Sequence, residues 1–159
     1  MKLHLGTWMG VPLYAHWSMI FFYAILTPTW AFWTAPFWYG LCTVTALFAV
    51  VATHEYAHTW EGLRLGYDVE KIHLIAIGGI AGFDDIPSGT WDEFRISLAG
   101  PVVNLILFVG VAFLIGPEAF SSLGGTSPFA HAPWTPEFWA VFSIMNLMLF
   151  GFNMLPIYP

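Results

Sequence analysis

Four long runs of apolar residues constrain the fold of this chain more than any other feature. They cover about residues 13–27, 39–61, 94–115 and 137–155, and a helix needs about 20 such residues to cross the hydrocarbon core of a bilayer. Only 9% of the residues are charged and 58% are hydrophobic, with a mean hydropathy of +0.70. This composition leaves too little polar surface for a domain surrounded by water. The sequence therefore predicts an all-α integral membrane protein, a multi-pass bundle of about four transmembrane helices in a lipid bilayer.

The segment between the second and third runs has a different period. Residues 71–77 alternate only loosely, and they are followed by Gly78-Gly79 and by a second short apolar stretch, residues 80–83. A strand, a glycine turn and a second strand fit this pattern. We expect a small β-hairpin insert over about residues 70–84, within a single membrane-embedded core that covers residues 1–159. The exposed edge of such a hairpin could accept an extended peptide, but a structural plug over the helix bundle fits equally well.

The positions of the basic residues predict the orientation in the membrane. All four fall in the N-terminal tail, between the second and third runs, or at the very start of the third: Lys2, Arg64, Lys71 and Arg95. Cytoplasmic segments carry an excess of Lys and Arg, so we place the hairpin and the end of the second run at the cytoplasmic boundary. Four basic residues cannot neutralise many phosphates, which argues against a nucleic-acid partner.

The second apolar run ends in the pentapeptide His54-Glu55-Tyr56-Ala57-His58. Residues four apart lie on one face of a helix, so both imidazoles can bind one cation while Glu55 lies beside them. Ionisable groups inside a membrane are costly without a partner, which favours a metal site over a chance match. Imidazole ligands and a neighbouring carboxylate are typical of hydrolytic zinc. We predict one catalytic Zn²⁺ held by His54 and His58, with Glu55 as general base.

The third and fourth runs contribute asparagines. Asn104 lies in the third, and Asn146 and Asn153 recur seven residues apart in the fourth, so the latter two should share a helix face. Amides are costly in lipid unless they are paired, so all three should point into the bundle. A catalytic zinc normally has three protein ligands, and only two are evident in this chain.

Four motifs in this order resemble the site-2 protease family of intramembrane zinc metalloproteases, in its compact prokaryotic branch. The resemblance covers nearly the whole chain, and its motifs are the pentapeptide, Ile77-Gly78-Gly79-Ile80-Ala81, Ser97-Leu98-Ala99-Gly100-Pro101-Val102-Val103-Asn104, and Asn153-Met154-Leu155-Pro156-Ile157-Tyr158-Pro159.

The resemblance implies an endopeptidase that cleaves transmembrane segments of regulatory membrane proteins, in a prokaryotic cell membrane, with its active site toward the cytoplasm. His54 and His58 match the family's zinc ligands and Glu55 its catalytic base. In relatives the last motif continues into Leu-Asp-Gly, whose aspartate is the third ligand. We therefore expect the core to continue beyond Pro159, with that ligand and a regulatory domain in the continuation. The chain as written should bind zinc weakly and turn over little.

The same resemblance suggests roles for two asparagines. Asn153 matches a family asparagine that is thought to hold the substrate or to stabilise the developing oxyanion, although an interhelical hydrogen bond is the alternative. Asn104 lies on the segment that packs beside the site, where structural hydrogen bonding is as good an interpretation as substrate contact. Asn146 is expected to make an interhelical hydrogen bond.

Two other classes of function remain open at this stage. In a membrane metal transporter, the histidines would pass the ion along; such proteins need polar groups distributed across the membrane, and beyond the pentapeptide the sequence offers only asparagines. In a catalytically inactive scaffold, the core would bind transmembrane helices without cleaving them.

Overall fold

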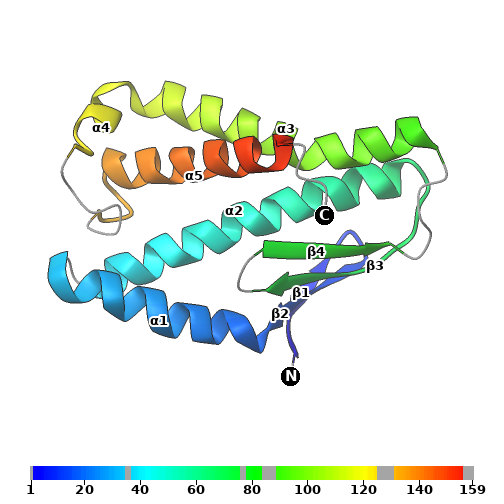
Figure 1. Cartoon of the computed structure of the whole chain (residues 1–159), viewed down its shortest axis with the longest axis horizontal. Helices are drawn as coiled ribbons and strands as arrows, with labels where there is room; N and C mark the ends of the chain where they lie inside the picture. The colour runs from blue at the N-terminus through cyan, green and yellow to red at the C-terminus, as the bar shows by residue number, and fades with distance from the viewer. Residues whose placement is uncertain (1, 35–36, 76–77, 84–88, 125–130, 156–159) are drawn as a thin grey trace.

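The computed structural model describes residues 2–34, 37–75, 78–83, 89–124 and 131–155, and it places four long helices beside a small sheet (Figure 1). The elements in chain order are β1 (Lys2–Trp8), β2 (Val11–His16), α1 (Trp17–Thr34), α2 (Phe37–Arg64), β3 (Val69–Ile75), β4 (Gly78–Phe83), α3 (Thr90–Ile115), the single turn α4 (Glu118–Ser121), and α5 (Pro136–Met154).

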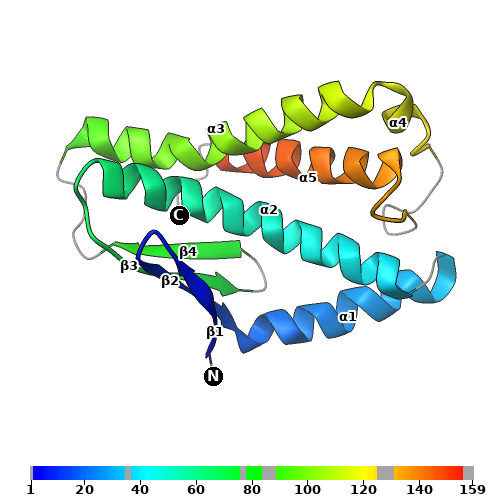
Figure 2. The same ribbon diagram turned by 180° about the vertical axis from the view of Figure 1, so that it is seen from behind.

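The helices lie roughly along the long axis of the molecule, with α2 in the middle. Figures 1 and 2 show α3 and α5 side by side on one side of α2, with α1 and the sheet on its other side. The last turn of α1, the first turn of α2 and α4 lie at one end of the bundle, and the sheet lies against the opposite half of α2. In both views α5 ends about halfway along α3, beside α2.

Local sequence signals set the ends of α2 and α5. After α2, Gly66 has a φ of 89°, and the Tyr67 N–H donates to the Gly62 carbonyl at 3.0 Å. Such a left-handed glycine closes the last turn because it satisfies carbonyls that have no intrahelical partner. At the start of α5, the Thr135 hydroxyl accepts from the Phe138 N–H, and Pro136 occupies the first helical position. Threonine as cap and proline in the first turn are typical of a helix N-terminus.

The described residues include three helices long and apolar enough to cross a membrane: α2, α3 and α5. Their outward faces are apolar, with Phe113 at 87% and Leu114 at 82% exposed. Several buried side chains are instead polar, namely Thr27, Thr43, His54, Thr59, Glu61, Asn104, Ser143 and Asn146. Most of these side chains have a hydrogen-bond or ion-pair partner, whereas the hydroxyls of Thr27 and Thr59 have none among the described residues. Apolar surroundings and a largely paired polar interior are what a bilayer imposes. The predicted helical membrane architecture is thus confirmed.

The sheet is larger than the hairpin expected from the sequence. The expected hairpin is present as β3 and β4, and residues 76–77 between them lie outside the described residues. Two more strands, β1 and β2, precede it, and β2 runs parallel to β3, with Tyr14 opposite His73. The first predicted helix therefore begins at Trp17, since the residues before it form β2. The sequence concealed this strand because its apolar residues merge with the run that follows.

The sheet packs one face against the helices. Val11 and Ala15 of β2 join Ile72 and Leu74 of β3 in a buried cluster, which also includes Val44 and Phe48 of α2 and Met19 of α1. This cluster holds the sheet against α2, and β4 is an edge strand in the order β1-β2-β3-β4.

An ion pair joins α2 to α3 one turn beyond the pentapeptide. The Glu61 carboxylate is buried, and its Oε1 lies 2.6 Å from Nη2 of Arg95, whose side chain is 34% exposed. Arg64 reaches the other oxygen at 3.7 Å with a side chain that is 61% exposed. The pair with Arg95 therefore carries the interhelical connection, because exposed pairs contribute little.

Arg95→Ala should destabilise the fold because it leaves the buried Glu61 carboxylate without its close partner. We expect a loss of about 2 kcal/mol, below the range for a fully buried pair because Arg95 is partly exposed. Arg64→Ala, which removes the distant partner, should cost less than about 1 kcal/mol. Unfolding in detergent measures the loss of stability in each variant. Equal losses would contradict the conclusion that the pair with Arg95 carries the interhelical connection.

Candidate metal centre

Helix α2 holds the two histidines one turn apart and turns both toward α3. His54 is 3% exposed, and its Nε2 lies 3.0 Å from Nε2 of His58. The other ring nitrogens have acceptors on α3: Nδ1 of His54 lies 2.6 Å from Oδ1 of Asn104, and Nδ1 of His58 lies 2.6 Å from the Ile96 carbonyl oxygen. Each imidazole is thus anchored at Nδ1 while the Nε2 atoms converge.

This arrangement fits a metal ion. Histidines that bind metals usually donate their second ring N–H to a carbonyl or carboxylate, which orients the ring. Two nitrogens that share a tetrahedral zinc lie about 3.3 Å apart, because each Zn–N bond is about 2.0–2.1 Å; the observed Nε2–Nε2 separation of 3.0 Å is close to this value. No group of three His, Cys, Asp or Glu side chains that could hold a metal occurs among the described residues, so this part of the chain offers two candidate ligands, His54 and His58.

Gly100 is what allows α3 to approach the imidazoles. A Cβ at this position would overlap Nε2 of His58 and would lie only 2.7 Å from Cε1 of His54. No side chain fits there without displacing the rings, so the site requires glycine. Its neighbour Pro101 is buried inside the same helix. The Gly-Pro motif of the sequence therefore marks a close approach of α3 to α2.

Glu55 follows His54 in α2 and is half-buried. Its role as general base stays a prediction from the pentapeptide.

The three asparagines occupy different environments. Asn104 and Asn146 are completely buried, and Nδ2 of Asn104 donates to Oδ1 of Asn146 at 2.8 Å. Asn153 is exposed, and its Nδ2 donates to the Leu149 carbonyl oxygen of its own helix at 2.8 Å. The expectation that Asn153 points into the bundle is therefore not met in the described residues, because its side chain is exposed and bonds back to its own helix. Asn104 fits the structural interpretation, since the NH₂ group and the oxygen of its amide both form hydrogen bonds within the protein.

An apolar groove of about 610 Å³ lies between α2 and α5. Its α2 wall is Leu47, Val50 and Val51, which continue at helical spacing into His54 and His58. Its α5 wall consists of Met145, Met148, Leu149, Gly151, Phe152 and Leu155. The groove thus leads along the membrane-spanning part of α2 to the stripe that carries the histidines.

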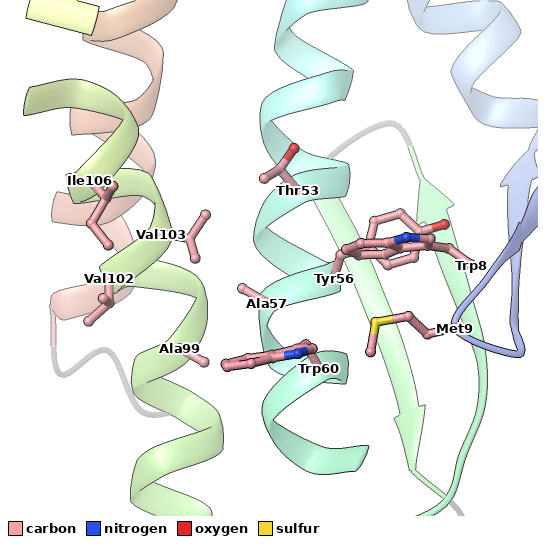
Figure 3. Close-up of a pocket in the computed structure, with 10 residues that line it drawn as sticks. All are labelled: Trp8, Met9, Thr53, Tyr56, Ala57, Trp60, Ala99, Val102, Val103 and Ile106. Atoms are coloured by element: carbon pink, nitrogen blue, oxygen red, sulfur yellow. The ribbon is translucent and has the colours of Figure 1, made fainter. Parts of the chain in front are cut away.

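A second groove, of about 540 Å³, lies between α2 and α3 on the side of the β1–β2 connection (Figure 3). Trp8 at the end of β1 and Met9 of the connection face Tyr56 and Trp60 of α2, and the Trp8 and Tyr56 rings meet edge to face with their centroids 4.3 Å apart. Its α2 residues follow a helix stripe next to the one that carries the histidines. The β1–β2 connection therefore lies close to the metal centre, which the sequence did not indicate.

Sequence reasoning missed two contributors to the site, Gly100 and Ile96, and one member of the ion pair beside it, Glu61. Gly100 belongs to a motif that was recognised, but a glycine reveals its role only when the atoms it admits are known. The Ile96 carbonyl has no sequence signal at all, because any residue there supplies the same oxygen. Glu61, three residues after His58, could have been found as an acidic residue on the buried face of the same helix.

Comparison with known proteins agrees with this fold and site. The model of Peptidase family M50 matches residues 42–135. A zinc metalloprotease from Methanocaldococcus jannaschii is 33% identical over 151 residues, which are 95% of this chain and 40% of that protein. A relative from Synechocystis sp. is 27% identical over 99% of this chain and 41% of its own length. The solved structure of a site-2 protease from M. jannaschii superposes with a TM-score of 0.74 at 28% identity, covering all of this chain and 67% of that one.

The fold and the paired histidines define a helical membrane protein with a metalloprotease motif. The chain belongs to Peptidase family M50, the site-2 protease family. It spans about two fifths of the length of the two sequence relatives described.

Gly100→Ala should weaken zinc binding about tenfold or more, because the new methyl group displaces both imidazoles. Gly110→Ala is the matched control on the same helix, since a Cβ there meets nothing within 4 Å and zinc affinity should not change. Competition with a chromophoric chelator measures both affinities. Equal affinities in the two variants would show that the close approach at Gly100 does not shape the site.

Proposed function

We propose that the protein is an intramembrane zinc endopeptidase that cleaves transmembrane segments of regulatory membrane proteins. The observation that carries the proposal is the convergence of two anchored imidazoles, with Nε2 atoms 3.0 Å apart, in a helix apolar enough to span a bilayer. Membership of a family whose relatives are named zinc metalloproteases supports the choice of metal.

The residues of this chain have distinct roles in the proposed reaction. His54 and His58 would hold one Zn²⁺, which when bound polarises the scissile carbonyl and makes water nucleophilic near neutral pH. Glu55 takes the proton from the attacking water and passes it to the leaving amine. The third ligand and the oxyanion contact of Asn153 stay predictions from the family resemblance.

An extended, apolar peptide is the substrate that suits the surroundings of the site. The groove between α2 and α5 could take an apolar segment within the membrane and lead it to the histidines. The methionines in its wall can adapt to different side chains. The edge strand β4 offers backbone groups to a segment that has unwound, since a helix must unwind before its carbonyl can be attacked. With the basic residues on the cytoplasmic side, cleavage would occur near that surface.

Glu55→Gln should abolish proteolysis, by about a hundredfold or more, because the amide cannot accept the proton. The zinc content should remain nearly unchanged, since both histidines are intact. Cleavage of a labelled single-span substrate in proteoliposomes, with zinc measured by elemental analysis, tests this.

Glu93→Gln is the matched control for Glu55→Gln: it makes the same change at an exposed position of α3 and should retain cleavage. Retained cleavage in Glu55→Gln would remove Glu55 from the mechanism. Zinc uptake into the vesicles without any cleavage would favour a transporter. Substrate binding without cleavage or uptake would favour a scaffold.

Gly151→Phe should slow cleavage of a transmembrane substrate because it places a ring in open space along the groove. Leu147→Phe on the same helix does not line the groove and should leave cleavage unchanged. Initial rates with a single-span substrate, at matched zinc content, compare the two. Equal rates would show that the substrate approaches by another path.

A further inference from the structure

A continuous chain of hydrogen bonds connects α5 to the metal centre. Nδ2 of Asn146 donates to the Phe142 carbonyl oxygen at 2.9 Å, and Nδ2 of Asn104 donates to Oδ1 of Asn146 at 2.8 Å. Oδ1 of Asn104 then lies 2.6 Å from Nδ1 of His54. The three side chains are at most 3% exposed, so water does not compete for these bonds. We call this chain the asparagine relay.

The direction of the asparagine relay follows from its first member. A backbone carbonyl can only accept, so Asn146 must turn its NH₂ group toward Phe142 and its oxygen toward Asn104. That oxygen also can only accept, so Asn104 must in turn present its NH₂ group to Asn146 and its oxygen to His54. Consequently Nδ1 of His54 must carry the hydrogen. The usual ambiguity of amide orientation and histidine tautomer is removed at each step.

The tautomer decides which nitrogen of His54 can bind a cation. With the hydrogen on Nδ1, the lone pair of the neutral ring is on Nε2, and this atom faces Nε2 of His58 at 3.0 Å. The Ile96 carbonyl imposes the same tautomer on His58 through its contact with Nδ1. Two lone pairs at this separation repel each other unless a positive group lies beside both. The buried acceptors therefore prepare the pair for a metal ion.

We propose that Asn104 and Asn146 are positioning residues, which hold His54 in the Nδ1-protonated tautomer and so keep its Nε2 as a metal ligand. Asparagine suits this role because its amide both donates and accepts without adding a charge to the buried site. The inference rests on the proposed metal site, and it adds to it a contribution from α5.

The competing explanation is that Asn146 acts only by packing α5 against α3. A variant of Ser143 distinguishes the two explanations. Ser143 lies one turn before Asn146 on α5, is completely buried, and donates to the Phe108 carbonyl of α3 at 3.0 Å. Ser143→Ala therefore breaks a hydrogen bond across the same helix interface without touching the asparagine relay. It is the matched control.

The first test is zinc affinity in the full-length protein, measured by chelator competition. Asn146→Leu should weaken binding about tenfold, the lower end of the usual effect of losing an outer-shell partner, and Ser143→Ala should not. In an Asn104→Asp background, Asn146→Leu should have no further effect, because a carboxylate oxygen accepts from Nδ1 of His54 without help from Asn146. Equal losses of zinc affinity in Asn146→Leu and Ser143→Ala would overturn the proposal. So would an Asn146→Leu variant that loses as much zinc affinity in the Asn104→Asp background as it does in the unchanged protein.

The second test needs no metal. Nitrogen NMR of histidine-labelled, metal-free protein at pH of about 8, where free imidazole is neutral, should show a single Nδ1–H tautomer for His54. The His54→Ala variant identifies the signal. Asn146→Leu should give a mixture of tautomers, and an unchanged signal would overturn the proposal even if Asn104→Asp fails to fold. If the unchanged protein binds no zinc, the proposed function fails, and the NMR result still decides whether the asparagine relay sets the tautomer.

Discussion

The contact between Gly100 on α3 and the imidazoles on α2 is the constraint on which the rest of the site depends. Because no Cβ intervenes, α3 comes close enough for the Ile96 carbonyl and the Asn104 amide to meet the two Nδ1 atoms. The same approach lets Arg95 reach Glu61 one turn further along. One missing methyl group thus permits three polar contacts between the same two helices.

The polar contacts are confined to the inside of an otherwise apolar bundle. In lipid, a polar group gains nothing by turning outward, so buried amides, hydroxyls and imidazoles must satisfy one another. Ser143 and Asn146 of α5 form hydrogen bonds with α3, and His54 and His58 of α2 form hydrogen bonds with the same helix. Helix α3 is therefore the shared partner, and its inner face determines how α2 and α5 are placed.

The sequence predicted the helices and the histidine pair well because both signals are local. Hydrophobic runs locate α2, α3 and α5, and the four-residue spacing of the pentapeptide places two imidazoles on one face wherever a helix forms. The parallel pairing of β2 with β3 joins segments more than 50 residues apart, so no local pattern reports it. Asn146 and Asn153 share a spacing but not an environment, because burial depends on where the neighbouring helix passes. The domain limits, the third ligand and the substrate stay predictions.

The parallel pairing also has a consequence for how the chain threads the bilayer. Strand β2 leads directly into α1, and β3 follows α2 after a short turn, so the two strands enclose a helical hairpin between them. Paired strands must lie on the same side of the membrane, and the chain between them must therefore cross an even number of times. If α2 traverses the lipid, α1 has to make the opposite passage. The strand pairing is therefore compatible with both helices in the lipid or with neither, and it couples the insertion of α1 to that of α2.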